Sequence, residues 1–352
     1  TSECTVKASS YQKISTFALV LLITGAIDSI RNLPATALFG STLIFFFLFS
    51  ALVFLIPIAL ISAELASTWS DEEGGVYSWI KHAFGDTMAF FTIWLQWINT
   101  LVWYPTILSF IAGTLAYLIN PALAHNKIYL IVVILTTFWS LTFIGLKGLR
   151  ASATLASFCA IVGMIAPMAI MIILAVIWII QGHPIAIDLS AKHLIPNWRD
   201  TQSWASLTAI VTAFLGMELA AVHVRNVKNP QQNYPRAMLF SVLLILITMI
   251  LGSLAIAFVL PKEKIGLVQG VMQAFTYFFE AYHLEKFMPL MIIMLLIGSL
   301  GGMVNWIISP AKGLLLAAEQ GFLPPWLYRE NKHAVVFSCC LRLILSIGSS
   351  PP

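Results

Sequence analysis

The chain has 352 residues, of which 59% are hydrophobic and only 10% are charged, and its mean hydropathy is +0.90. Soluble domains carry about 25% charged residues, so this composition excludes a soluble globular protein and indicates an integral protein of the lipid bilayer. The formal net charge is only +4, with no basic stripe to suggest a nucleic-acid partner, and the four cysteines follow no metal-ligand spacing. No cofactor or metal is therefore expected.

Eight stretches of the chain are long and apolar enough to cross a membrane, which takes about 20 apolar residues. The first of them lacks a clear cleavage site, so it is expected to be a retained helix rather than a removed signal peptide. Lys and Arg are more frequent in the alternate loops that include the N-terminus, which predicts a cytoplasmic N-terminus. The eight stretches lie at about 14–38, 42–68, 86–118, 127–146, 152–181, 204–224, 236–260 and 287–317.

Two connections between these stretches have a composition that predicts structure. Asp71–Gly85 contains a glycine pair followed by Tyr77 and Trp79, and it is expected to form an amphipathic helix on the inner surface. Gly182–Ser203 is rich in His, Pro and Trp and is expected on the outer side.

Two of the apolar stretches are interrupted by glycine and by an acid. One interruption lies in residues 23–34 and the other in residues 212–220. Broken helices at corresponding places in two halves of a membrane protein indicate a substrate site near the middle of the bilayer. This pattern makes a secondary transporter the leading hypothesis.

At the first interruption, Asp28 and Arg31 are three residues apart. On an intact helix this spacing brings the two side chains together, and they would form an ion pair that eases membrane insertion. The alternative is that the helix unwinds near Ile27, Asp28 and Ser29, so that free backbone groups bind the charged ends of a substrate. Asp28 could then bind a substrate ammonium group or carry a proton, since charged groups inside spans mark pathways.

At the second interruption, Phe214, Leu215 and Gly216 precede Glu218. Glycine weakens a helix by about 1 kcal/mol relative to alanine. Glu218 either ties the loosened backbone to a neighbouring helix or takes part in proton transfer. Glu64, in the second apolar stretch, has the same two readings, of which the structural one is favoured.

Other polar residues of the apolar stretches are expected to face the interior of the bundle. Packing is the default role for such groups, and Tyr104 and Asn305 are also candidates for coupling or gating. The run Gly298–Gly302 follows no strand and precedes no Lys-Ser/Thr pair, so it predicts a tight helix crossing rather than a phosphate-binding loop.

Several stretches in order along the chain resemble bacterial amino acid permeases of the amino acid–polyamine–organocation superfamily, and most closely the glutamate/GABA antiporter branch. The similarity covers about residues 14–333. It is carried by Ile56–Ala66 leading into Glu72–Trp79, Gly216-Met217-Glu218 followed by Val227–Pro230 and Tyr234–Met238, Gly270–Phe275, and Ser309–Leu314 with Gly321–Pro325.

This resemblance implies an all-α core of two inverted five-helix repeats, with the first and sixth helices unwound around an amino acid substrate. By position, the substrate carboxylate and amine would meet the backbone around Ile27-Asp28-Ser29 and Phe214-Leu215-Gly216. The chain departs from the superfamily at the first break, where Ile27-Asp28-Ser29 replaces the usual Gly-Ser-Gly. Asp28 would repel a carboxylate on the substrate side chain unless Arg31 or a proton offsets its charge.

The resemblance also sets the expected organisation of the chain. The transporter core would occupy residues 1–333, with a first repeat at about 14–181 and the start of a second at about 204–333. Residues 334–352 form a short apolar tail interrupted by Arg342, and the family continues through twelve spans, so a truncated or frameshifted end is expected.

Amino acid transport across the bacterial inner membrane by alternating access, with antiport favoured, is the function that these features predict. The expected partners are an amino acid and the bilayer, while protons and the oligomeric state are left open. The alternative is a truncated fragment that transports nothing. An embedded enzyme or receptor is disfavoured because no catalytic cluster or extramembrane domain is visible.

Overall fold

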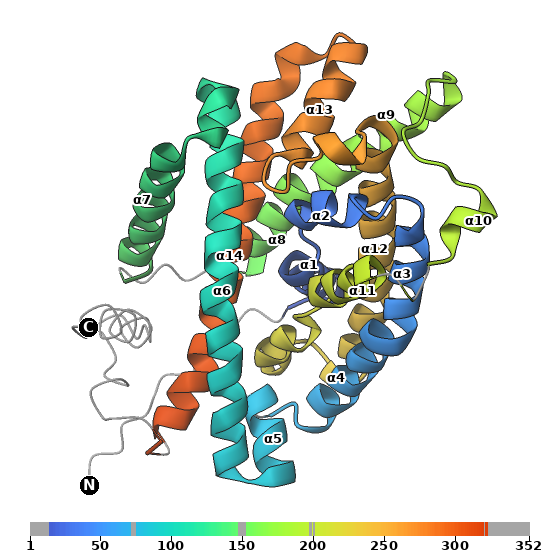
Figure 1. Ribbon diagram of the computed structural model, residues 1–352. Helices are drawn as coiled ribbons and strands as arrows, with labels where there is room; N and C mark the ends of the chain where they lie inside the picture. Colours follow the sequence, from blue (N-terminus) through green and yellow to red (C-terminus); the bar gives the residue numbers. More distant parts are fainter. Residues whose placement is uncertain are drawn as a thin grey trace, which may run out of the picture.

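The computed structural model describes residues 14–71, 75–146, 153–196, 199, 201–319 and 321–322. In this part of the chain the structure is all α-helical, and its only β-type pairing is an isolated bridge between Ile14 and Val227 (Figure 1). The predicted all-α membrane fold is thereby confirmed. The elements are α1 Thr16–Ile27, η1 Ile30–Asn32, α2 Leu33–Ala37, α3 Thr42–Ser50, η2 Ala51–Leu55, α4 Ile56–Thr68, α5 Val76–Phe84, α6 Asp86–Ile119, η3 Pro121–His125, α7 Lys127–Leu146, α8 Ala153–Ala160, η4 Ile161–Ile165, α9 Ala166–Ile180, α10 Ala191–Leu194, α11 Thr201–Ala213, η5 Met217–Asn226, α12 Pro230–Val259, η6 Lys262–Lys264, α13 Gly270–Ala281, η7 Glu285–Phe287 and α14 Met288–Glu319.

Seven of the eight predicted spans correspond to helical segments that are long and apolar enough to cross a membrane, among the residues described. The remaining predicted span, at about 127–146, corresponds to α7. Its described apolar part, Lys127–Leu141, is shorter than the other seven segments. Some large apolar side chains, among them Ile128 and Leu52, have most of their surface exposed. Lipid is the environment that suits such an outer surface. The seven segments are Thr16–Ala37, Thr42–Thr68, Asp86–Ile119, Ser157–Ile180, Ser203–Ala221, Pro230–Val259 and Glu285–Met303.

Two of these spans contain a wide helical turn just before a proline. The turn η2 separates α3 from α4, which has Pro57 as its second residue, and η4 separates α8 from α9, which has Pro167 as its second residue. Proline has no N–H to donate and its ring crowds the preceding turn. A widened turn relieves this conflict without ending the helix, so both spans continue.

The long helices α6 and α14 run along each other, and α14 also crosses η4 (Figure 1). At that crossing Gly163 of η4 meets Gly298 of α14 backbone to backbone, and a Cβ added to either glycine would collide with the other chain segment. The predicted tight crossing at Gly298–Gly302 is therefore confirmed. Small residues allow such close approach between membrane helices.

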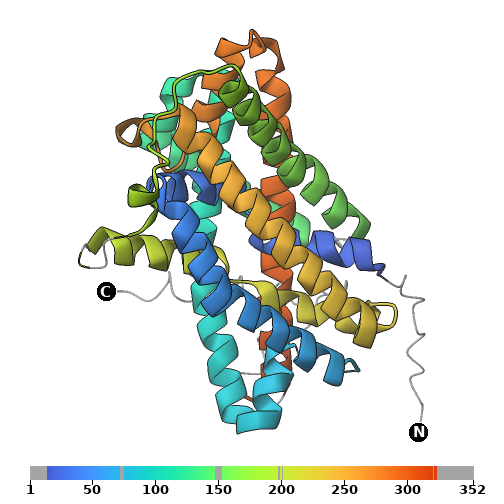
Figure 2. The same ribbon diagram turned by 90° about the vertical axis from the view of Figure 1, so that its right-hand side faces the viewer.

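The helix α12 is the long tilted element beside α1, α4 and α9, and Figure 2 shows it crossing the bundle obliquely. It is among the most completely buried helices of the structure, with Met249, Ala255 and Ile256 fully enclosed. Because it contacts both α1 and α2, it can hold the two parts of the first interrupted span in place.

Both connections that the sequence predicts to be structured contain helices. Within Asp71–Gly85, α5 buries Tyr77 and Trp79 and leaves Phe84 exposed. In the connection after α9, the Asp188 carboxylate accepts a 2.8 Å hydrogen bond from the backbone N–H of Ser190 and lies 3.1 Å from Nδ1 of His193. These contacts, of which the hydrogen bond from the Ser190 N–H has the largest effect, hold the pKa of Asp188 below its usual value. The side of the membrane on which each connection lies stays a prediction.

Candidate functional site

The first interrupted span changes direction at Asp28 and Ser29. Helix α1 ends at Ile27, both following residues have extended backbone angles, and the chain coils again only from Ile30. The end of a helix leaves its last C=O groups, and the start of the next its first N–H groups, without helical partners. Of the two predicted readings of this segment, the structure has the unwound one.

The second interrupted span breaks between α11 and η5. After Ala213 the chain turns through Phe214 and Leu215, and Gly216 has a φ of 120°. A side chain would be strained at this angle, which glycine adopts readily. Glycine at this position therefore explains why the helix stops here, as the sequence predicts.

Three hydroxyl contacts fix the first interrupted span to α12. Ser241 Oγ donates to the C=O of Val20 at 3.3 Å, and Thr248 Oγ1 donates to Oδ2 of Asp28 at 2.6 Å. Beyond the break, the hydroxyl of Thr36 lies 2.6 Å from that of Ser253. The helix α12 thus supports the span before, at and after its unwound residues.

The Thr36–Ser253 contact gives a first testable prediction. Ser253→Ala is expected to lower the free energy of unfolding by about 1 kcal/mol, the net value of one buried hydrogen bond. The loss stays small because Thr36 Oγ1 also donates to the C=O of Leu33 at 3.0 Å and so keeps a partner. Thermal unfolding in detergent measures this loss of stability, with Ser299→Ala as control, since the hydroxyl of Ser299 donates its hydrogen bond to the C=O of Leu295 in its own helix. Equal stability of the two variants would contradict the prediction.

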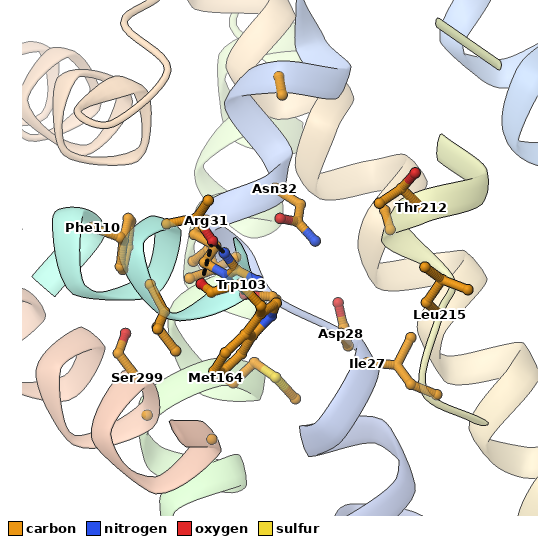
Figure 3. Close-up of a pocket in the computed structure, with 18 of the residues that line it drawn as sticks. Ile27, Asp28, Arg31, Asn32, Trp103, Phe110, Met164, Thr212, Leu215 and Ser299 are labelled. Atoms are coloured by element: carbon orange, nitrogen blue, oxygen red, sulfur yellow. Dashed lines mark hydrogen bonds between the residues drawn. The ribbon is translucent and has the colours of Figure 1, made fainter. Parts of the chain in front are cut away.

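A cavity of about 540 Å³ lies where the two breaks meet (Figure 3). This is within the usual range of about 300–1,000 Å³ for small-molecule sites. Its wall combines residues 25–32 of the first break with Thr212, Ala213 and Leu215 of the second. The rest of its lining comes mainly from α6, η4 and α14 and includes Asn99, Trp103, Thr106, Phe110, Met164 and Ser299.

The guanidinium group of Arg31 is held against α6 at one side of this cavity. Its Nε donates to Ser29 Oγ at 3.1 Å and its Nη1 donates to Thr106 Oγ1. The guanidinium carbon also lies 4.9 Å from the centre of the Trp103 ring, a cation–π contact. All of these partners are neutral, so the positive charge of Arg31 is oriented by its contacts without being cancelled by them.

Asp28 lies on the other side of the break, directed away from Arg31 (Figure 3). Its side chain is 1% exposed, and its Oδ1 has no hydrogen-bond partner while Oδ2 is held by Thr248. Asp28 and Arg31 are not among the ion pairs found in the described part of the chain. The ion-pair reading of their spacing is therefore wrong, because that spacing brings side chains together only on an intact helix.

The structure brings five of the seven predicted substrate-binding residues to the cavity wall, namely Ile27, Asp28, Ser29, Arg31 and Leu215. The other two belong to the second break without lining the cavity: Phe214 is fully buried with its ring 5.7 Å from that of Phe47, and Gly216 forms the turn.

Three of the four candidates for coupling or gating, Glu218, Glu64 and Tyr104, are not among the residues that line the cavity. The carboxylate of Glu218 is close to the backbone N–H of Gly216, an arrangement consistent with tying down the loosened backbone. Glu64 is exposed on α4, and the Tyr104 ring packs 6.3 Å from that of Phe138 on α7. Asn305 lies on α14, but its side chain is outside the described residues, as is the tail at 334–352.

Sequence reasoning missed the role of Trp103 and Thr106, which orient Arg31 from α6. These residues lie 72 and 75 positions further along the chain, and their spacing carries no local signal of that contact. The one available hint was an arginine inside an apolar span, since such a charge needs polar or aromatic neighbours somewhere in the fold.

A helical membrane bundle in which two interrupted helices meet at a shared cavity has the architecture of a secondary transporter. The chain matches the amino acid permease family over residues 14–349 and belongs to it.

Known bacterial proteins share much of this sequence. The chain is 41% identical over 324 residues to an uncharacterized transporter of Legionella pneumophila, covering 92% of this chain and 69% of that protein. It is 30% identical over 327 residues to a glutamate/gamma-aminobutyrate antiporter of Lactococcus lactis, covering 92% and 65%. An aspartate/glutamate permease of the same species is 26% identical over 317 residues, covering 84% and 63%. The chain thus spans about two thirds of the length of these relatives.

Proposed function

We propose that this protein carries amino acids across a bacterial inner membrane by alternating access, as an exchanger of one amino acid for another. Its N-terminus would lie in the cytoplasm, and residues 14–181 and 204–333 would belong to two inverted repeats that move about a central site. The observation that carries the proposal is the single cavity shared by the unwound residues of both breaks.

The two ends of an amino acid fit the two kinds of backbone group at the first break. The N–H groups that open the segment from Ile30 attract a carboxylate, while the C=O groups that end α1 at Ile27 attract an ammonium group. The end of α11 at Ala213 adds further C=O groups at the cavity. A zwitterion would thus bind mainly to the backbone, which leaves the cavity side chains to select the substrate side chain.

Arg31 favours an acidic substrate. A guanidinium group presents a planar fork that matches a carboxylate, and the charge of Arg31 is not neutralised by Asp28. A carboxylate on the substrate side chain would occupy the region beside Trp103 and Thr106 and leave Asp28 on the opposite side. The names of two relatives, which refer to glutamate and aspartate, agree with this choice.

Counterflow in proteoliposomes tests the proposal. The purified 352-residue protein is expected to exchange internal unlabelled glutamate or aspartate for labelled external substrate, faster than it exchanges neutral or basic amino acids. Absence of exchange for every amino acid, from protein shown to be inserted and monodisperse, would contradict transport by this chain and would favour the alternative of a fragment that transports nothing.

Asp28→Asn is expected to lower the rate of exchange at least about tenfold while the protein still inserts. The acid sits at the unwound residues, and a loss of about 1.4 kcal/mol of interaction already corresponds to a factor of ten. The measurement is counterflow of the best substrate at several pH values, with Asp86→Asn as control, because Asp86 is exposed at the start of α6. Unchanged kinetics across the pH range would contradict a role for Asp28.

A further inference from the structure

A second cavity, of about 790 Å³, lies where the helices α6, α9 and α12 end. Its wall includes Tyr117 near the end of α6, Trp178 near the end of α9 and Phe258 near the end of α12. The helix α13, which contacts both α9 and α12, and the short turn η7 supply much of the rest. No residue lines both this cavity and the one between the two breaks, so the second cavity is a separate site.

Hydrogen bonds between different elements hold the wall of the second cavity in shape. Nε1 of Trp178 donates to the C=O of Pro184 at 3.1 Å, which fixes the connection after α9 against that helix. The backbone N–H of Gly266 donates to Oε1 of Gln273 at 2.9 Å, and this bond ties the loop that carries Lys264 to α13. The lining side chains are therefore presented by segments that are fixed to one another.

The place of the second cavity is typical of the boundary between lipid and water. Aromatic rings at the ends of membrane-spanning helices commonly lie at this depth, and the rings of Trp178 and Tyr277 are 5.9 Å apart in the wall. The last residues of two neighbouring helices, Ile119 of α6 and Ile180 of α9, are 66% and 78% exposed. A ligand with a polar head and apolar chains fits both kinds of surface.

The lining of the second cavity carries charges of both signs. Lys264, Glu280 and Glu285 line it, and all three are exposed. In the part of the chain that the structure describes, none of them takes part in an ion pair. The hydroxyl of Thr276 donates to the C=O of Met272 within α13 at 2.8 Å, so toward a ligand it can only accept a hydrogen bond. The wall thus offers hydrogen-bond acceptors to a cation and one ammonium group to an anion.

We propose that the second cavity binds the headgroup of a phospholipid that carries a primary ammonium group, of the phosphatidylethanolamine kind. The lipid ammonium group donates hydrogen bonds to the carboxylates of Glu280 and Glu285, and the rings of Trp178 and Tyr277 attract the same charge. Lys264 binds the lipid phosphate. The acyl chains lie along the exposed apolar residues at the ends of α6 and α9.

Other headgroups satisfy fewer of these groups. A choline headgroup is positively charged but has no N–H to donate to the two carboxylates, and a glycerol headgroup has no positive charge at all. The soluble compound glycerophosphoethanolamine has the right charges but no acyl chains to cover the neighbouring apolar residues. The proposal does not depend on the proposed transport, because the two cavities share no residue.

Native mass spectrometry of the purified 352-residue protein in detergent, titrated with dioleoyl phospholipids in the absence of amino acid, tests the site. Phosphatidylethanolamine is expected to fill a single saturable site about fivefold more tightly than phosphatidylcholine or phosphatidylglycerol. That factor corresponds to one exposed ion pair near the upper end of its usual range.

Two changes at exposed positions separate the parts of the headgroup. The double variant Glu280→Gln/Glu285→Gln is expected to lose the preference for phosphatidylethanolamine over phosphatidylcholine. Lys264→Gln is expected to weaken the binding of both lipids about fivefold, because both contain the phosphate. The matched controls are Glu263→Gln and Lys127→Gln, which remove exposed charges that do not line the cavity.

Equal affinity for the three lipids, or a preference that the double variant leaves unchanged, overturns the proposal. Displacement of the lipid by glycerophosphoethanolamine at a similar concentration also overturns it, since the ligand would then be a soluble compound. Selective binding of phosphatidylethanolamine by protein that exchanges no amino acid supports the lipid site and contradicts the proposed transport.

Discussion

Arg31→Met is expected to reduce counterflow of acidic amino acids by at least about 30-fold. Truncating one partner of a buried, hydrogen-bonded charge pair costs about 2–5 kcal/mol. A cost of about 2 kcal/mol already corresponds to a roughly 30-fold reduction. Arg31→Lys keeps the positive charge but loses the planar fork that donates to Ser29 and Thr106. It is therefore expected to recover only part of the rate.

The initial rate of counterflow for glutamate, aspartate and a neutral amino acid in the same vesicles measures the effect of Arg31→Met. Arg236→Met is the matched control, since it removes an exposed arginine from α12 that is not among the residues lining the cavity. A variant that loses acidic and neutral substrates equally, or that retains glutamate exchange, would contradict a role for Arg31 in recognising the substrate side chain.

Gly163→Ala is expected to destabilise the protein by more than about 3 kcal/mol, above the usual range for an overpacked site. The added Cβ would meet the backbone of Gly298 and, at 2.6 Å, the C=O of Met294. Backbone atoms of a packed helix cannot turn aside as a flexible side chain can, so η4 and α14 would have to separate. The gain of about 1 kcal/mol in helix propensity from replacing glycine does not offset this loss.

Thermal unfolding and the monodisperse fraction on size-exclusion chromatography measure the effect of Gly163→Ala. Gly302→Ala is the control. It adds a methyl group on the α14 side, near the same crossing, but that Cβ would meet nothing nearer than the C=O oxygen of Gly25 at 3.8 Å. If Gly163→Ala is as stable as Gly302→Ala, the close crossing of η4 and α14 is not present in the folded protein.

The membrane class, the approximate spans and the places of the two breaks could all be predicted from the amino-acid sequence. These features depend on local chemistry. A run of apolar residues is stable in lipid wherever it lies in the fold, and an acid such as Asp28 or a glycine such as Gly216 weakens a helix at its own position. The crossing at Gly298 was predictable for the same reason, since small residues in an apolar span permit close packing whatever the partner.

The contacts of the charged residues depend on how the helices pack, and they could not be predicted from the sequence. The spacing of Asp28 and Arg31 was compatible with an ion pair or with an unwound segment, and these exclude each other because the pair requires an intact helix. The support from α12 holds Asp28 on one side, while α6 holds Arg31 on the other through Thr106 and Trp103. Such contacts join residues 72 to 220 positions apart, so no local pattern encodes them; they exist because the helices pack in one particular arrangement.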